Sequence, residues 1–182
     1  MFGIKTCGTY PARNHETVLN TFITPNEQVV KETAEYIIGG LIRDSVEDRV
    51  AAAFNFVAVN IVYTSDRKQF GKNDFWQYSR ETLGQVFTDG TVAKMYGDCE
   101  DSSFLLASLL IASGVPTKNV RVGISTVHAW VEVKLGGIWY LFETTDDKEM
   151  TGFITAKSIV GKGYVYDVQV YVYQGGCVYG RR

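Results

Sequence analysis

Apolar residues recur at helical spacing in the first part of the chain, beginning after the stretch TPNE at Thr24 to Glu27. This stretch predicts a helix start, because Thr24 can cap the helix, Pro25 suits its first position and Glu27 completes a capping box. The positions that follow form one apolar stripe: Val29, Val30, Ala34, Ile37, Ile38 and Leu41. A first helix is therefore expected to pack one face against a core.

The stretch SVED predicts the start of a second helix, with Ser45 as the cap and Asp48 closing the box. Its buried stripe is Val50, Phe54, Val57, Ala58 and Ile61. Residues 65–80 indicate an irregular loop rich in aromatic side chains, and a short helix is expected after Ser79.

The stretch GDCEDSSFLLASLL predicts a third helix, from Asp98 to about Ser113. Gly114 and Pro116 follow directly and end it. Apolar residues cover most of its circumference, which is typical of a helix that is buried on all sides. We therefore expect this helix at the centre of the fold.

From Val120 onward the apolar pattern changes to every second residue, which predicts strands. The expected strands span Val120–Ser125, Val127–Leu135, Ile138–Thr144 and Tyr164–Tyr173, with a weaker one near Phe153–Ala156. Helices followed by strands favour an α+β fold in which helices pack on an antiparallel sheet. We expect a single domain over residues 1–182, helical over about 24–113 and sheet over about 120–175.

The 182 residues carry a net charge of −2, which argues against the strongly basic surface of a protein that binds nucleic acid or anionic membranes. No apolar run reaches the ~18 residues of a membrane span. The start MFGIKTCGTYPARNHE lacks the basic and apolar regions of a secretory signal. The sequence therefore predicts a soluble, cytoplasmic protein without nucleic-acid or membrane partners.

The chain has three cysteines, Cys7, Cys99 and Cys177, and two histidines, His15 and His128. Their spacing does not form a structural zinc site, and no calcium-loop pattern is present, so we expect no metal and no cofactor. Cys7 and Cys177 could pair if the chain ends meet, but two free thiols are favoured in a reducing compartment. His15 lies in a polar stretch and is expected at the surface.

Cys99 falls at the first position of the third helix, where unpaired backbone N–H groups and the helix dipole stabilise a thiolate. Asp98 suits the N-cap, and Asp101 stands where a capping-box acid belongs. At ~100° per residue, Glu100 lies about 100° and Asp101 about 200° around the helix from Cys99. The acids could then bind the scaffold while the thiol faces a site. The alternative is an inert buried cysteine, and strong acidity would require a cationic partner.

The stretch VHAWVEVKLGGIWYLFETT predicts a β-hairpin that turns at Gly136-Gly137. If the residues flanking that turn pair with each other, alternation places His128, Trp130 and Glu143 on one face of the sheet. His128 and Glu143 are then diagonal neighbours with Cα atoms about 7–8 Å apart, which a glutamate can span to reach an imidazole. A slip of one residue would separate them.

Together these residues predict a nucleophile, Cys99, a general base, His128, and an orienting acid, Glu143. A carboxylate beside the imidazole favours its charged form, which would lower the pKa of the thiol. The structural alternatives are a packed histidine and a solvated carboxylate. All three groups in workable geometry favour the catalytic interpretation.

The pieces FWQYSRETL, YGDCEDSSFLLASLLIASGVP, HAWVEV and GGIWYLFETT, in that order, resemble the transglutaminase-like superfamily, in particular its bacterial and viral cysteine-peptidase-like members. The resemblance covers roughly Phe75 to Thr145. It implies a papain-like core, in which a central helix carries the nucleophile Cys99 and an antiparallel sheet carries His128 and Glu143.

The family usually has aspartate followed by proline where this chain has Glu143-Thr144, so Asp146 and Asp147 are alternative third members. The backbone N–H of Cys99 is a natural oxyanion donor. The resemblance also implies the indole N–H of Trp76 as a side-chain donor, and Gln85 and Tyr96 are its rivals.

The expected function is hydrolysis of a peptide or related amide bond through an acyl-thioester, with a peptide or protein as substrate. Transamidation or deamidation of glutamine by the same triad is the second reading. A catalytically inactive binding module is the third, and the tyrosines of the final strand could then form its surface. These are Tyr164, Tyr166, Tyr171 and Tyr173. The sequence leaves the substrate and the oligomeric state open.

Overall fold

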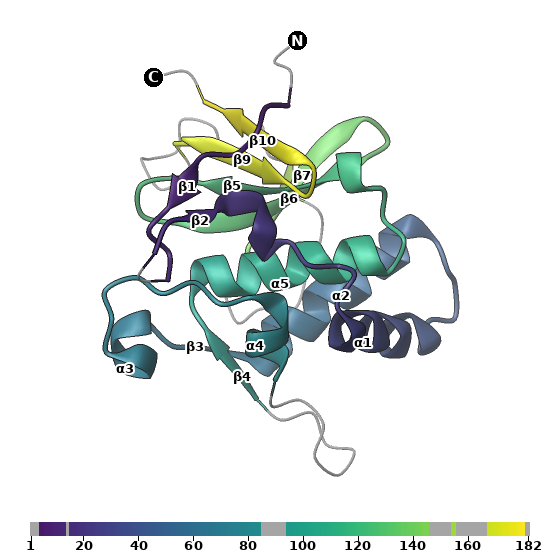
Figure 1. The fold of residues 1–182 in the computed structure, drawn as a ribbon. Helices are drawn as coiled ribbons and strands as arrows, with labels where there is room; N and C mark the ends of the chain where they lie inside the picture. Colours follow the sequence, from purple (N-terminus) through teal and green to yellow (C-terminus); the bar gives the residue numbers. More distant parts are fainter. Residues whose placement is uncertain (1–3, 14, 85–93, 146–153, 156–166, 181–182) are drawn as a thin grey trace.

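The computed structural model of the protein describes residues 4–13, 15–84, 94–145, 154–155 and 167–180. A six-stranded antiparallel sheet lies over a layer of helices, which confirms the predicted α+β architecture (Figure 1). None of the described helices combines the length and apolar character that crossing a membrane requires.

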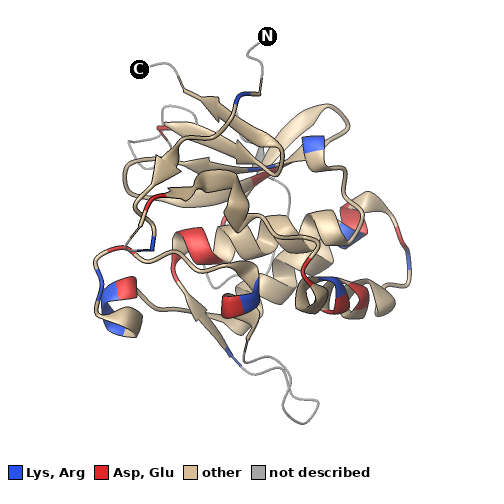
Figure 2. Ribbon diagram, in the orientation of Figure 1, with Lys and Arg blue, Asp and Glu red and all other residues tan. Residues whose placement is uncertain are grey.

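The helical layer is built around α5 (Cys99–Ala112), in which every residue from Glu100 to Leu110 is buried. The remaining helices are α1 (Gln28–Gly39), α2 (Val46–Asn60), the short α3 (Asp66–Phe70) and α4 (Ser79–Leu83), and two 3-10 turns, η1 (Leu19–Phe22) and η2 (Thr117–Asn119). Helix α5 lies between the sheet and the α1–α2 pair, so it occupies the predicted central position. Charged residues lie mostly in the helical layer and are sparse on the sheet (Figure 2).

The sheet has the strand order β10-β9-β5-β6-β7-β8. Its strands are β5 (Val120–Ile124), β6 (Ala129–Leu135), β7 (Ile138–Phe142), β8 (Ile154–Thr155), β9 (Val170–Tyr173) and β10 (Gly176–Tyr179). Leu135 pairs with Ile138 and Val131 with Phe142, so the predicted hairpin register is confirmed. Strand β9 begins later than predicted, and Tyr164 and Tyr166 lie outside the described residues.

Helix starts follow the predicted caps only in part. Ser45 accepts a hydrogen bond from the Asp48 backbone N–H at 3.1 Å, as expected for a capping box. Helix α1 begins at Gln28 rather than at Pro25, although Thr24 Oγ1 does donate to Glu27 Oε2 at 3.0 Å. The prediction placed the α1 start too early because the same polar residues can form a turn before the helix.

Several short strands were not predicted. These are β1 (Thr9–Tyr10), β2 (Thr17–Val18), β3 (Ile61–Tyr63), β4 (Met95–Gly97) and β10. Strands of two to four residues are too short to display an alternating pattern. The pair β3–β4 is parallel and brings the chain after α2 beside the start of α5.

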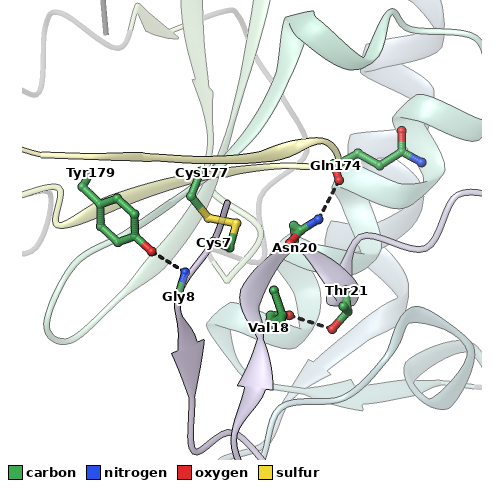
Figure 3. Close-up of a disulfide and its surroundings, with 8 residues drawn as sticks. All are labelled: Cys7, Gly8, Val18, Asn20, Thr21, Gln174, Cys177 and Tyr179. Carbon is green, nitrogen blue, oxygen red and sulfur yellow. Dashed lines mark hydrogen bonds between the residues drawn. A yellow bond between two sulfur atoms is a disulfide. The ribbon is translucent and has the colours of Figure 1, made fainter. Parts of the chain in front are cut away.

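Cys7 and Cys177 form a disulfide with Cα atoms 4.9 Å apart (Figure 3), so the expectation of two free thiols is wrong. The chain ends meet because Lys5 and Cys177 exchange backbone hydrogen bonds at 2.9 and 2.8 Å. Asn20 Nδ2 also donates to the Gln174 carbonyl at 2.9 Å. Such contacts join residues far apart in sequence, which local patterns do not reveal.

Candidate active site

A cavity of about 530 Å³ opens at the start of α5, and both Cys99 and His128 line it. Its other walls come from the segment around α3, from the β5–β6 turn and from the N-terminal strand β1. The sequence predicted that Cys99 and His128 would share a site, and the fold brings both to one cavity.

His128 precedes β6 and is held by a tight turn, in which its backbone N–H donates to Ser125 Oγ at 3.1 Å. Its Nε2 hydrogen-bonds Glu143 Oε2 at 2.6 Å. The other oxygen of Glu143 accepts from the Thr145 backbone N–H at 3.1 Å and from its hydroxyl at 2.6 Å. Burial acts to raise the pKa of Glu143, but the bonds from His128 and Thr145 outweigh it and the pKa is lowered. Glu143 is therefore an ionised carboxylate fixed at both oxygens.

The ring of His128 also packs on Trp130, with centroids 6.2 Å apart and planes 26° from parallel. Trp130 lies over Gly123, where an added Cβ would come within 2.5 Å of the indole. Its Nε1 donates to Glu132 Oε1 at 3.0 Å. A fixed indole thus bounds one side of the imidazole.

Glu132 is buried and also accepts hydrogen bonds from Arg121 and from the hydroxyl of Tyr171. Arg121 in turn donates to the hydroxyl of Tyr173 at 3.2 Å and lies over the ring of Tyr171. Both tyrosines of the predicted binding surface that the structure describes are therefore tied into a polar network on the sheet.

Cys99 occupies the first position of α5, as predicted, and is partly exposed. Its thiol donates to Glu100 Oε2 at 3.1 Å. Burial raises the pKa of the thiol, and the Glu100 carboxyl raises it further. The surroundings therefore favour the protonated thiol, whereas the helix end alone would favour the thiolate.

The two aspartates beside Cys99 do not cap the helix as predicted. Asp98 occupies the N-cap position, but its side chain makes no capping hydrogen bond. Asp101 instead accepts from the backbone N–H and from Nε2 of Gln77, at 2.7 and 2.6 Å. Gly97 permits this arrangement, since an added Cβ there would lie 2.7 Å from the Asp101 Cβ. Asp101 therefore anchors the aromatic loop to the nucleophile helix.

Trp76, the predicted oxyanion donor, is buried in the wall of the cavity. Its indole N–H donates to Asp74 Oδ1 at 2.6 Å, and Tyr10 donates to the other oxygen of Asp74 at 2.7 Å. The indole N–H is thus engaged by Asp74 and does not point to a substrate oxygen. The oxyanion role of Trp76 therefore stays a prediction. Among its rivals Tyr96 is exposed on β4 and Gln85 lies outside the described residues, as do the alternative acids Asp146 and Asp147.

An acidic cluster that the sequence did not predict lies beside the thiol. Asp66, Asp98 and Glu100 each place one oxygen within 4.8 Å of the others. Asp66 Oδ1 and Asp98 Oδ1 are buried, and neither has a hydrogen-bond partner among the described residues. Buried carboxylate oxygens without partners are costly, and three carboxylates this close together suit a hard cation with oxygen ligands.

The acidic cluster lies in a buried site where, among the described residues, nearby positive side chains do not balance its negative charge. Burial raises the pKa of Asp66 to about 6, and burial together with Asp98 raises the pKa of Glu100. Figure 2 shows the acidic residues at the start of α5, and no Lys or Arg occurs among the described residues that line the cavity. The pairing of β3 with β4 brings Asp66 close to Asp98 and Glu100. Because Asp66 is distant from them in sequence, no local motif predicts the cluster.

His15 is exposed, as predicted. It does not line the cavity that holds Cys99 and His128.

Comparison with solved structures shows a shared fold. LapG of Legionella pneumophila in its EGTA-treated form superimposes with a TM-score of 0.59 at 14% identity, over 90% of this chain and 84% of LapG. The calcium-bound LapG superimposes with a TM-score of 0.57 at 15% identity, over 90% of this chain and 88% of LapG.

No curated protein matches the chain. A sequence model of the transglutaminase-like superfamily matches residues 31–144, which include Cys99, His128 and Glu143. The chain therefore belongs to the transglutaminase-like superfamily.

Proposed function

We propose that the protein hydrolyses peptide or related amide bonds with Cys99 as nucleophile. The observation that carries this proposal is the 2.6 Å hydrogen bond between His128 Nε2 and Glu143 on the wall of the cavity that contains Cys99. A histidine that an ionised acid orients, lining the same cavity as a thiol, supplies the groups that acyl transfer requires.

The reaction proceeds in two halves. His128 takes the thiol proton through Nδ1, since Nε2 is bound to Glu143, and the sulfur attacks the amide carbonyl. The backbone N–H of Cys99 stabilises the oxyanion, and His128 returns the proton to the departing amine as the C–N bond breaks. Water then attacks the acyl-thioester with His128 as base, which releases the acid and restores the thiol.

We also propose that a divalent cation binds Asp66, Asp98 and Glu100. Their oxygens are the ligands that calcium prefers, and the related LapG structure is described as calcium-bound. A bound cation would offset the negative charge beside Cys99, where Glu100 accepts a hydrogen bond from the thiol. The two unpartnered oxygens support this proposal independently of the comparison.

Hydrolysis of fluorescently labelled casein tests both proposals. Wild-type protein should release labelled peptides with calcium present, release fewer after EGTA treatment, and Cys99→Ala should release none. Asp66→Asn should behave in calcium as wild type does in EGTA. Equal turnover by wild type and Cys99→Ala would overturn the enzyme proposal and favour a binding module. Incorporation of a fluorescent amine in place of hydrolysis would favour transamidation.

We propose that the protein works in an oxidising compartment rather than in the cytoplasm that its composition first suggested. The pairing of Cys7 with Cys177 supports this, because disulfides are rare in reducing compartments. Alkylating free thiols in intact producing cells before lysis tests it. Label on Cys7 and Cys177 would overturn the proposal, while label confined to Cys99 would support it.

A further inference from the structure

A buried pair of hydroxyls joins the nucleophile helix to the strand end that carries the third triad member. Ser102 lies in the first turn of α5, and Thr144 directly follows Glu143. Their side-chain oxygens are 2.7 Å apart, and both residues are essentially inaccessible to solvent. Hydroxyls buried this deeply are costly unless they are paired.

The direction of the two bonds follows from the available protons. Ser102 Oγ donates to the backbone carbonyl of Cys99 at 3.1 Å, which uses its single hydrogen. Thr144 must then donate to Ser102 Oγ. A continuous path of two hydrogen bonds therefore runs from Thr144 through Ser102 to the nucleophile's own carbonyl.

The same short segment also holds the acid. Thr145 binds one oxygen of Glu143 through both its backbone N–H and its hydroxyl, while His128 binds the other. Side chains of successive residues therefore point to opposite sides of the segment. Thr144 contacts helix α5, whereas Glu143 and Thr145 lie on the side of His128. A shift of this segment would move the helix and the imidazole relative to each other.

We propose that Ser102 and Thr144 are positioning residues, which set the distance and angle between the Cys99 thiol and the His128 ring. This inference rests on the proposed function, since it assigns a role in the same reaction. Neither residue touches the substrate carbonyl in this role. Their effect should therefore appear in kcat, because a misplacement of ~1 Å can cost about 100-fold in rate.

Helix α5 provides a matched control two turns further on. Ser79 Oγ donates to Ser108 Oγ at 2.8 Å, and Ser108 Oγ donates to the Phe104 carbonyl at 2.7 Å. This second path has the same chemistry on the same helix and is also fully buried, but it joins α5 to α4 instead of to the triad strand. Ser108 Oγ also accepts a hydrogen bond from the Thr24 backbone N–H at 2.9 Å, so Ser108→Ala reports the cost of losing at least as many buried hydroxyl bonds away from the triad strand.

The experiment measures kcat and KM for casein hydrolysis, with calcium, in Ser102→Ala, Thr144→Val, Thr144→Ser, the Ser102→Ala/Thr144→Val double variant and Ser108→Ala. Thermal midpoints show how much each substitution destabilises the fold. Ser102→Ala and Thr144→Val should each lower kcat about 10-fold or more with KM little changed. The double variant should be no worse than either single one. Thr144→Ser should retain the wild-type kcat.

Ser108→Ala should lower the thermal midpoint at least as much as Ser102→Ala, yet leave kcat within about 2-fold of wild type. If Ser102→Ala and Ser108→Ala lose the same kcat, the inference is overturned. It is also overturned if Thr144→Ser is as slow as Thr144→Val. Should Ser102→Ala fail to fold, the Thr144 pair alone decides. Undiminished turnover by Cys99→Ala would instead refute the proposed function itself, so the two failures are distinguishable.

Discussion

Removing the Cys7–Cys177 bond should destabilise the protein by a large and calculable amount. The two cysteines are 170 residues apart, so the bond closes almost the whole chain into one loop. The loop-closure model then gives about 5 kcal/mol of lost stability at 25 °C, because the unfolded chain regains its freedom. With an unfolding entropy of about 0.4 kcal/mol/K for a chain of this length, the thermal midpoint should fall by roughly 13 °C.

Reduction should also affect the cavity before the protein unfolds. The bond fastens the N-terminal segment to the sheet, and this segment supplies Tyr10 and Leu19 to the cavity wall. Tyr10 packs on Trp76 with ring centroids 4.6 Å apart, so loosening one would free the other. We therefore expect casein hydrolysis to weaken under reduction at temperatures below the melting transition.

Calorimetry with and without dithiothreitol checks the prediction, and a Cys7→Ser/Cys177→Ser variant serves as the control. The wild-type midpoint should drop on reduction to the value of the variant, which dithiothreitol should leave unchanged. Cys99 is present in both proteins, so its chemistry cancels in the comparison. A drop below about 3 °C in the wild type, or an equal drop in the variant, would refute the reasoning.

Four further predictions concern the site and its surroundings. Glu143→Gln should lower kcat about 10³–10⁴-fold, since an amide does not hold the imidazole as the carboxylate does, and wild-type kcat in single-turnover assays would contradict this. In EGTA the thermal midpoint should rise as pH falls from 7.5 towards 5. Burial raises the folded-state pKa of Asp66 to about 6 and of Asp101 to about 7, so the folded protein binds more protons than the unfolded chain and loses stability as pH rises through these values. Saturating calcium should raise the midpoint at pH 7.5 and leave Asp66→Asn unaffected, whereas equal shifts in both would rule out the site. Gly123→Ala should destabilise the fold by about 1–3 kcal/mol in urea titrations, because its Cβ would meet the Trp130 indole, and an unchanged midpoint would argue against that close contact.

The parts of the site that depend on local pattern could be predicted from the sequence. Alternation in β6 and β7 and the glycine pair between them specified the register, and that register places Glu143 within reach of His128. The position of Cys99 at the helix start follows from the apolar run that begins after it. These features arise within a few residues of each other, where backbone preferences are strong.

The parts that depend on distant segments could not be predicted. Asp98 is a good N-cap by type, but its side chain lies in the acidic cluster with Asp66, which only the tertiary fold brings near. Glu100 was expected about 100° around the helix from Cys99, yet it accepts a hydrogen bond from the thiol. The positions of these side chains depend on burial by several distant elements, which the spacing of residues along the chain does not predict.

The parallel pair β3–β4 has a consequence for how the cavity could change. Tyr63 and Gly97 are neighbours across this pair, so the chain departs from the pair and returns to it at almost the same place. The excursion between them supplies Asp66, Asp74 and Trp76 to the cavity, while the nucleophile helix and the hairpin lie outside it. One wall could thus be exchanged during evolution as an interchangeable unit, with the reacting groups left untouched. Divergence of selectivity among related proteins should therefore concentrate in that excursion.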